Sequence, residues 1–244
     1  MEKDAEVSRS IPVAIKREVR KRCCFGCVIC GAPVWHYDHM EEFATVNEHT
    51  AENITLLCPN HHQEKTSRRL SKEAVLRHNE RPFSCSHERS APHKMFFSAQ
   101  PFTIRVGSMT YTVSSLPDSG EFPAIRFCGE TLVGFIYEDG NLLLNLLQRD
   151  VLGNIILQIF KGELTVSTNL GDFEYIGPTL RIKPRFSSEL VFVQSADSID
   201  IQKGFFFGFG RTLEIQPDGL IVVQPMNLRI QGFMTTDCRI GLEV

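Results

Sequence analysis

The sequence lacks an apolar run long enough to cross a membrane, since no stretch approaches the roughly 18 uncharged residues of a spanning helix. It also lacks an apolar segment behind the charged start Met1–Asp4, so no secretory signal is expected. Both absences predict a cytoplasmic chain. The 244 residues, 42% hydrophobic and 23% charged, are ordinary for a globular protein of one large or two small domains.

A surplus of positive charge is missing too. The net charge is −3 and the pI is about 6.2, so composition alone does not indicate nucleic-acid binding. Residues 1–94 hold 15 Lys and Arg against 13 Asp and Glu, whereas the remaining residues hold 11 against 16. All eight histidines and six of the eight cysteines lie in the first part. This concentration indicates bound metal rather than disulfides in a cytoplasmic chain.

The residue pattern divides the chain into four zones. Residues 1–10 are polar and are expected to be flexible, and residues 11–80 hold the cysteines and histidines of a first domain. Residues 81–95, with prolines and serines among charges, are typical of a linker. Residues 96–244 contain short β-rich runs separated by Gly, Pro, Asp and Ser, which predicts an all-β domain for recognition, regulation or oligomerisation. The expected class is therefore α+β.

Residues 11–80 predict the order helix, cysteine turn, strand, loop, strand, helix. Pro12 suits the first turn of a helix that includes the basic residues up to Arg22. Extended segments are expected from Val34 to His39 and from Ile54 to Leu57, and the second helix is expected from His61 through Leu70.

The β-rich zone offers a hairpin and a loose repeat. Apolar and polar residues alternate from Phe102 to Val113, with Gly107-Ser108 as the turn. Apolar-polar-apolar triplets recur at intervals of 26, 23 and 25 residues, beginning at Leu164, Leu190, Leu213 and Cys238. A repeat of this length is typical of a β-solenoid, which we favour slightly, and a β-sandwich is the alternative.

Two short motifs have the spacing of metal ligands. Cys27 and Cys30 form a CxxC turn followed by glycine, and Cys58 and His61 form a CxxH turn. Four ligands of this kind complete a tetrahedral zinc shell that leaves no position for water, as in structural zinc sites. A small module with a thin core gains stability from such a site.

Other cysteines leave alternatives open. Cys24 and Cys27 are also spaced CxxC, so Cys23 or Cys24 could replace Cys27 as a ligand. Cys85 and the histidines that follow it have a spacing that fits no defined metal site.

The stretch from Cys27 to Lys65 resembles the HNH endonuclease family with its ββα-metal fold, and the resembling region extends over roughly residues 11–80. The motifs CVIC, YDH, ENITLLC and PNHHQEK occur in the family's order. The signature letters fall on His39, Asn53 and His62. The family more often has a cysteine at the position of His61, so exchanged roles for His61 and His62 remain an alternative.

The resemblance implies hydrolysis of nucleic-acid phosphodiesters, with DNA as the expected substrate and a 5′-phosphate and a 3′-hydroxyl as products. His39 is expected to be the general base, because the pKa of imidazole lies near working pH. Asp38 and His62 are expected to hold a catalytic Mg²⁺ or Mn²⁺ with open positions for water and phosphate. Asn53 is expected to hold the His39 backbone across the Met40–Glu52 loop.

Lys65, Arg68 and Arg20 are expected to contact phosphates, although a solvated helix face is the alternative. His49, in the loop before Asn53, is expected to be an exposed loop residue, and an approach to the substrate is the alternative. The combination of a nuclease with a second domain suggests restriction or phage defence, and double-strand cleavage suggests a homodimer. The alternative function is a zinc module that binds nucleic acid without cutting it.

Overall fold

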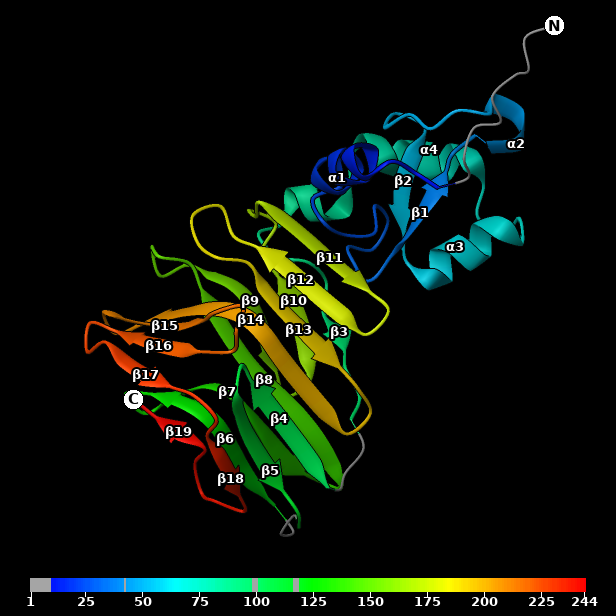
Figure 1. The fold of residues 1–244 in the computed structure, drawn as a ribbon. Coiled ribbons are helices and arrows are strands. Elements are labelled where there is room, and N and C mark those ends of the chain that lie inside the picture. Colours follow the sequence, from blue (N-terminus) through cyan, green and yellow to red (C-terminus); the bar gives the residue numbers. More distant parts are fainter. Residues whose placement is uncertain (1–9, 42, 98–100, 116–118) are drawn as a thin grey trace, which may run out of the picture. The chain divides into compact units, whose positions relative to one another are not determined.

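The computed structural model describes residues 10–41, 43–97, 101–115 and 119–244 (Figure 1). The chain divides into two compact units, with the boundary between Ala91 and Pro92. In the first unit, helices surround a two-stranded sheet, and the described part of the second unit is built from β-strands and their connections. The expected α+β class is confirmed.

The first unit contains the expected elements in the expected order. Helix α1 (Val13–Arg22) follows Pro12, and strand β2 (Ile54–Leu57) has the bounds that the sequence predicts. Among the described residues, no helix combines the length and the apolar character that a membrane crossing requires. The remaining elements are β1 (His36–His39), α2 (Phe43–Val46), α3 (Pro59–Thr66), α4 (Lys72–Glu80) and the 3-10 turn η1 (Phe83–Ser86).

Strand β2 lies at the centre of the first unit. It pairs antiparallel with β1, so that His39 lies opposite Ile54. All four residues of β2 are buried, because α1 and α3 both pack against it. The surrounding core includes Val19 of α1 and Val75 of α4. Strand β1 is therefore attached to a fixed support along its whole length.

The helix expected from His61 to Leu70 has different bounds in the structure. Helix α3 begins earlier, at Pro59, and ends at Thr66. It stops because Arg68 has a φ of +60°, which a right-handed helix cannot accommodate. A separate helix, α4, begins after Ser71, whose hydroxyl caps its first turn.

Arg22, at the end of α1, fastens the segment that leads into β2. Its guanidinium donates hydrogen bonds to the backbone carbonyls of Ala51 and Ile54 and, at 3.2 Å, to Asn79 Oδ1. Hydrogen bonds from a charged donor are stronger than neutral ones. Because Ala51 and Ile54 flank Asn53, this arginine fixes the backbone on both sides of a predicted site residue.

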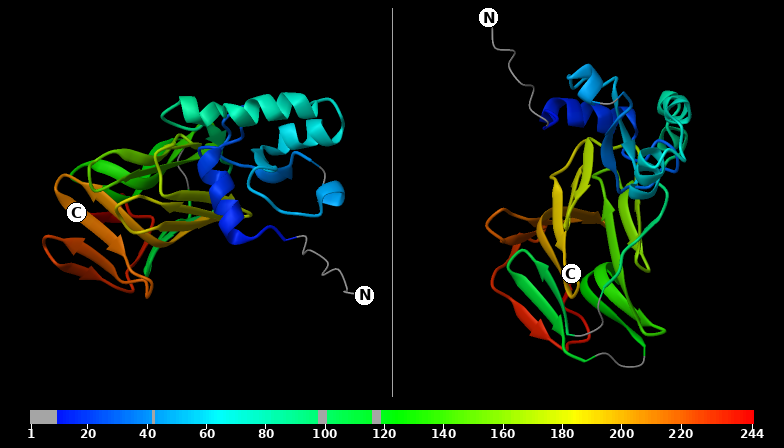
Figure 2. Two further views of the ribbon diagram at one scale, coloured as in Figure 1. Left: turned by 90° about the horizontal axis from the view of Figure 1, so that it is seen from above. Right: turned by 90° about the vertical axis from the view of Figure 1, so that its right-hand side faces the viewer.

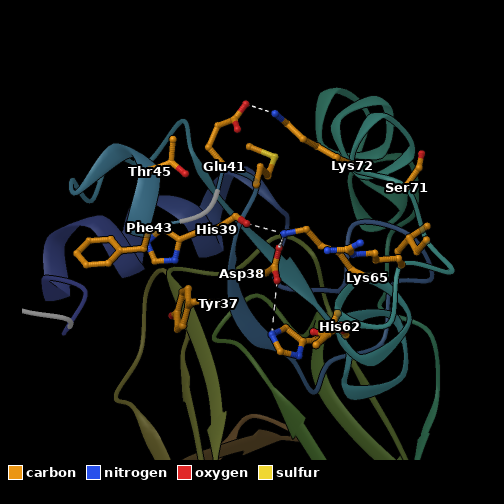
Figure 3. Close-up of a pocket in the computed structure, with 14 residues that line it drawn as sticks. Tyr37, Asp38, His39, Glu41, Phe43, Thr45, His62, Lys65, Ser71 and Lys72 are labelled. Carbon is orange, nitrogen blue, oxygen red and sulfur yellow. Dashed lines mark hydrogen bonds and ion pairs between the residues drawn. The ribbon is translucent and has the colours of Figure 1, made fainter.

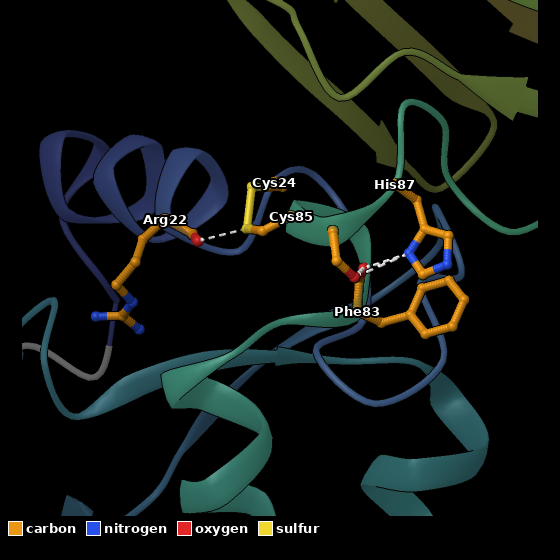
Figure 4. Close-up of a disulfide and its surroundings, with 6 residues drawn as sticks. Arg22, Cys24, Phe83, Cys85 and His87 are labelled. Carbon is orange, nitrogen blue, oxygen red and sulfur yellow. Dashed lines mark hydrogen bonds between the residues drawn. A yellow bond between two sulfur atoms is a disulfide. The ribbon is translucent and has the colours of Figure 1, made fainter.

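Residues 81–95, which the sequence suggests are a linker, carry structure in both units. Cys85 forms a disulfide with Cys24, which follows α1 (Figure 4). The Ala91 N–H donates to a backbone carbonyl of the first unit. Beyond the boundary, β3 (His93–Lys94) pairs with a strand of the second unit. The expectation that clustered cysteines hold metal rather than disulfides is wrong for Cys24 and Cys85, because folding brings these two distant residues together.

The described residues of the second unit form two sheets (Figure 2). One has the strand order β19-β6-β7-β8-β9-β10-β3, and the other runs from β11 to β17, with β4, β5 and β18 attached beside β14. The strands are β4 (Phe102–Val106), β5 (Met109–Val113), β6 (Gly120–Phe127), β7 (Glu130–Glu138), β8 (Asn141–Arg149), β9 (Ile155–Phe160), β10 (Glu163–Val166), β11 (Asp172–Ile176), β12 (Thr179–Lys183), β13 (Leu190–Gln194), β14 (Ser198–Gly208), β15 (Arg211–Ile215), β16 (Ile221–Gln224), β17 (Leu228–Ile230), β18 (Met234–Thr236) and β19 (Leu242–Glu243).

The two sheets of the second unit face one another. The ring of Phe102 on β4 lies 3.9 Å from that of Phe135 on β7, measured between centroids. Gln148 of β8 is fully buried and donates to the Phe205 carbonyl of β14 at 3.1 Å. Strands β4 and β5 form the expected hairpin, with Phe102 opposite Val113. Facing sheets with apolar inner surfaces are the architecture of a β-sandwich.

The solenoid, which the sequence pattern favours slightly over a sandwich, is wrong. A solenoid stacks parallel rungs, whereas most neighbouring strands here are consecutive and antiparallel. The triplets that begin at Leu164, Leu190 and Leu213 do fall on strands β10, β13 and β15. They share no parallel stack, and residues 238–240 are not a strand. Two strands lie between β10 and β13 but only one lies between β13 and β15, so the even spacing of the triplets is not a structural repeat.

The disulfide leads to a prediction about stability. Cys24→Ser should lower the free energy of unfolding of the first unit by about 2–4 kcal/mol, because the unfolded chain loses a cross-link that closes a long loop. Cys24 has a φ of +49°, and serine is close to cysteine in size. The substitution therefore removes the disulfide without adding backbone strain at this position. Urea unfolding followed by fluorescence of Trp35, the single tryptophan, measures the first unit.

The matched control is Cys128→Ser, which alters an exposed free cysteine of the second unit. It should leave the Trp35 transition unchanged. An equal urea midpoint for Cys24→Ser and the wild-type chain would contradict a stabilising disulfide.

Candidate functional site

Four predicted metal ligands converge in the first unit. The ligand atoms of Cys27, Cys30, Cys58 and His61 all lie within 4.8 Å of one another. His61 Nδ1 is 3.4 Å from the Cys27 sulfur and 3.2 Å from the Cys58 sulfur. The Cys30 and Cys58 sulfurs are 3.8 Å apart. Within the described residues, no other group of three or more such ligands meets this distance.

Local backbone structure brings the two pairs together. Gly31 has a φ of +71° and its N–H donates to the Cys27 carbonyl, which closes the turn that carries both cysteines. A side chain at Gly31 would meet the ring of Phe83 at 2.3 Å, so the turn requires glycine. The second pair lies at the start of α3, where Cys58 is the N-cap and His61 follows in the first turn.

The donor set fits zinc. For Zn–S bonds of about 2.3 Å, the edges of a tetrahedron between sulfurs measure about 3.8 Å, in agreement with the sulfur–sulfur distance. Contact with the Cys27 and Cys58 sulfurs raises the pKa of the Cys30 thiol, whereas contact with Cys27 and Cys30 lowers that of Cys58. Thiolates so close together repel one another and ionise together only beside a cation. The geometry and chemistry therefore suit a divalent metal.

The other cysteines of this unit are not ligands of the cluster. Cys24 and Cys85 are joined in the disulfide. Cys23 is fully buried, and burial raises the pKa of its thiol. Its hydrogen-bonding neighbours are Thr55, Arg22 and a backbone group of β2 rather than the cluster. The alternative in which Cys23 or Cys24 replaces Cys27 is therefore wrong.

Three of the four predicted catalytic residues, Asp38, His39 and His62, line a pocket of about 870 Å³ on the first unit (Figure 3), whereas Asn53 is not among its lining residues. Strand β1, the loop after it, helix α3 and the segment leading into α4 all contribute to its wall. The lining residues are Tyr37, Asp38, His39, Met40, Glu41, Phe43, Thr45, His62, Lys65, Thr66, Arg68, Leu70, Ser71 and Lys72.

Asp38 forms the centre of one wall of this pocket. It is buried, with 7% of its surface exposed. One carboxylate oxygen lies 3.5 Å from His62 Nε2, and the other contacts the ammonium group of Lys65. Lys65 also donates to the His39 carbonyl oxygen. Two ligands bound to one ion at about 2.1 Å lie roughly 3–3.5 Å apart, so the Asp38 and His62 atoms fit a shared metal.

His61 and His62 point to different sites. Consecutive helical residues are rotated by about 100°, so neighbours cannot address one ion. His61 Nδ1 faces the cysteines, and His62 faces Asp38. The geometry agrees with the assignment of His61 to the metal cluster, and not with the exchanged roles.

His39 is directed away from Asp38 and toward Phe43, whose ring centroid is 5.4 Å away (Figure 3). Alternate residues of a strand face opposite sides, which separates these two neighbours. Burial lowers the pKa of His39, with a further contribution from His49. The lowered pKa favours the neutral imidazole, the form that can accept a proton.

Asn53 bridges the ends of the loop that follows β1. Its Oδ1 accepts from the Glu41 N–H at 2.7 Å, and its Nδ2 donates to the Glu41 carbonyl at 3.2 Å. The backbone N–H of Met40 donates to the Asn53 carbonyl at 2.8 Å. These bonds hold the backbone immediately after His39, as the sequence predicts.

The residues expected to contact nucleic acid have different environments. Lys65 and Arg68 line the pocket. Arg20 is only 3% exposed and donates to the Tyr37 hydroxyl at 2.7 Å. The expectation that Arg20 contacts phosphate is therefore wrong, because this arginine supports β1 from within the unit.

The sequence does not predict the contact between His49 and His39. It is half-buried rather than exposed, and its Nδ1 lies 3.0 Å from His39 Nε2. Its ring stacks on that of Phe43, with 4.6 Å between the centroids. The only sequence signal was a histidine within the loop that joins His39 to Asn53, which does not specify the partner.

Comparison with known proteins supports the same stretch. Residues 27–68 match the family model described as HNH endonuclease, so the resemblance of this stretch to that family is confirmed. The match includes all four residues of the cluster formed by the three cysteines and His61, and it lies entirely within the first unit. No curated protein and no solved structure matches the chain.

The cluster leads to a prediction about metal content. The purified full-length protein should contain one zinc ion per chain by mass spectrometry, and Cys58→Ser should lose most of it, because a tetrahedral site then keeps three ligands. Cys23→Ala is the matched control, since it changes a buried cysteine outside the cluster. Full zinc occupancy in Cys58→Ser, or none in the wild-type chain, would contradict the assignment.

Proposed function

We propose that the first unit is a metal-dependent endonuclease that hydrolyses phosphodiester bonds of nucleic acid, with His39 as the general base. One observation carries the proposal: Asp38, His39 and His62 line a single pocket within the stretch that matches the HNH endonuclease family. The bridge from Asn53 to Glu41 supports it, because this bridge fixes the backbone beside His39.

The side chains divide the chemistry between them. His39 takes a proton from the attacking water, which its neutral imidazole allows. Asp38 and His62 would hold Mg²⁺ or Mn²⁺, which supplies a Lewis acid for charge that develops on the phosphate. Lys65 lies between the Asp38 carboxylate and the His39 carbonyl and aligns the two neighbours. Products with a 5′-phosphate and a 3′-hydroxyl follow from the family resemblance.

The proposed metals have separate tasks. Zinc in the cluster of three cysteines and His61 would be structural, since a closed tetrahedral shell has no position for water. The pair Asp38 and His62 supplies only two protein ligands, which leaves positions for water and phosphate oxygens. A site of this kind accepts Mg²⁺ or Mn²⁺.

The proposed substrate is double-stranded DNA. Lys65, Arg68 and Lys72 line the pocket. Lys65 is paired with Asp38 and Lys72 with Glu41, so Arg68 is the lining cation best suited to meet a phosphate. The second unit would serve recognition, regulation or self-association, and a homodimer would allow one cut in each strand. A role in restriction or phage defence is the biological setting that this combination suggests.

The first test of the proposal is cleavage itself. The full-length protein should nick supercoiled plasmid DNA with Mn²⁺ or Mg²⁺, and His39→Ala should reduce the rate about 10²–10⁴-fold, the usual contribution of a general base. His78→Ala is the matched control, because His78 is exposed on α4 and lies outside the pocket. Parallel assays with linear, single-stranded and RNA substrates define the preferred nucleic acid.

One result would contradict cleavage itself, and another would contradict the role of His39. If zinc-loaded protein binds DNA but leaves it intact with every metal, the alternative of a non-cleaving nucleic-acid-binding module is correct. If His39→Ala cleaves at the wild-type rate, His39 is not the base.

The opposite orientation of Asp38 and His39 gives a second test. Asp38→Asn should weaken Mn²⁺ binding by on the order of tenfold or more, since the carboxylate supplies the negative charge of the pair. His39→Ala should bind Mn²⁺ as the wild-type protein does and yet cleave about 10²–10⁴-fold more slowly. Calorimetric titration of zinc-loaded protein with Mn²⁺ measures the binding affinity of each variant. An equal loss of affinity in Asp38→Asn and His39→Ala would contradict the division of roles.

A further inference from the structure

The rings of His39 and Phe43, which line the pocket, pack together with the ring of His49. His49 Nδ1 lies 3.0 Å from His39 Nε2, which is hydrogen-bonding distance. Phe43 stacks on His49 with an interplanar angle of 17°, and its ring centroid is 5.4 Å from that of His39. The phenyl ring thus fixes the plane of His49, and His49 in turn contacts one nitrogen of His39.

A hydrogen bond at one imidazole nitrogen determines what the other nitrogen can do. Neutral imidazole carries a proton on one nitrogen and a lone pair on the other. His39 Nε2 is engaged by His49, so its Nδ1 is the nitrogen left to receive a proton. Nδ1 has its lone pair only if Nε2 carries the hydrogen. His49 Nδ1 must then be the acceptor of that hydrogen bond.

We propose that His49 is a positioning residue that holds His39 in the tautomer with the hydrogen on Nε2 and directs its Nδ1 lone pair toward the attacking water. This inference rests on the proposed function of His39 as the base. When water is deprotonated, its proton moves to His39 Nδ1, and the hydrogen on Nε2 remains bonded to His49. No proton leaves the pair in this step.

The loop has other anchors, so His49 is not needed to hold it closed. Asn53 bonds to Glu41 at the two ends of the loop, and the Asn47 N–H donates to the Phe43 carbonyl at 2.8 Å. Arg22 holds the Ala51 carbonyl. A substitution at His49 should therefore change the orientation of His39 without unfolding the loop.

Two substitutions separate the hydrogen bond from the ring packing. His49→Asn places an amide oxygen near the position of Nδ1, so it keeps an acceptor for His39 and loses the stack on Phe43. His49→Phe keeps an aromatic ring beside Phe43 and has no acceptor. If positioning through the hydrogen bond matters, His49→Asn should be active and His49→Phe should not, whereas a purely structural role for the ring predicts the reverse.

The kinetic experiment uses zinc-loaded full-length protein, supercoiled plasmid DNA and Mn²⁺. His49→Phe should lower kcat about 10–100-fold with KM unchanged, the usual effect of losing a partner that orients a functional histidine. His49→Asn should stay within about threefold of wild-type kcat. A wild-type kcat for His49→Phe, or equal losses in both variants, would overturn the proposal.

A second measurement does not depend on cleavage. Nitrogen NMR of ¹⁵N-histidine protein at neutral to mildly alkaline pH, assigned with His39→Ala, reports which ring nitrogen carries hydrogen. Wild type and His49→Asn should show His39 with hydrogen on Nε2, and His49→Phe should show mixed tautomers. Hydrogen on Nδ1 in the wild-type protein would overturn the inference even if the plasmid is cut. If the plasmid is not cut but the tautomer pattern is as stated, the proposed function fails and the His49–His39 contact stands.

Discussion

The convergence of Cys27, Cys30, Cys58 and His61 on one point is the constraint from which the rest of the first unit follows. It joins the turn after α1 to the first turn of α3. Strand β2 ends immediately before α3 begins, so the cluster also fixes the end of β2. Strand β1 is paired with β2 over its full length. A shift of α3 relative to the turn would therefore displace both walls of the pocket, because α3 carries one wall and β1 carries the other.

The same constraint explains how adjacent residues perform different tasks. Once His61 faces the cluster, helical geometry turns His62 toward Asp38. Once β1 is paired with β2, the alternation of a strand turns Asp38 and His39 to opposite sides. In these two neighbouring pairs, His61 is a ligand of the cysteine cluster, and Asp38 and His62 are candidate ligands for a catalytic ion. His39 is the candidate base. Backbone periodicity alone separates these functions, and no additional side chain is required to enforce the separation.

Much of this site could be predicted from the sequence, because its motifs are local. Ligand spacing identifies the two cysteine and histidine turns, and the run Ile54–Leu57 gives the bounds of β2. The failures involve partners that are distant in sequence. Burial of Arg20 against Tyr37, the bond from Cys24 to Cys85 and the contact of His49 with His39 all depend on how the chain closes on itself. The second unit shows the same limit, since apolar triplets predict strands but not which strands pair or in which direction.

The two units also differ in what holds them together, and the open pocket of the first unit accounts for the difference. The second unit buries many large apolar residues between two sheets, among them Phe102, Phe127 and Phe173. The first unit opens a pocket of about 870 Å³ beside the two-stranded sheet of its described residues, so fewer apolar side chains can meet there. Polar and covalent links act in their place: the cluster of cysteines with His61, the Cys24–Cys85 disulfide and the hydrogen bonds of Arg22. A pocket that stays open cannot be filled by a hydrophobic core, and cross-links at its edges stabilise the surrounding fold in place of that core.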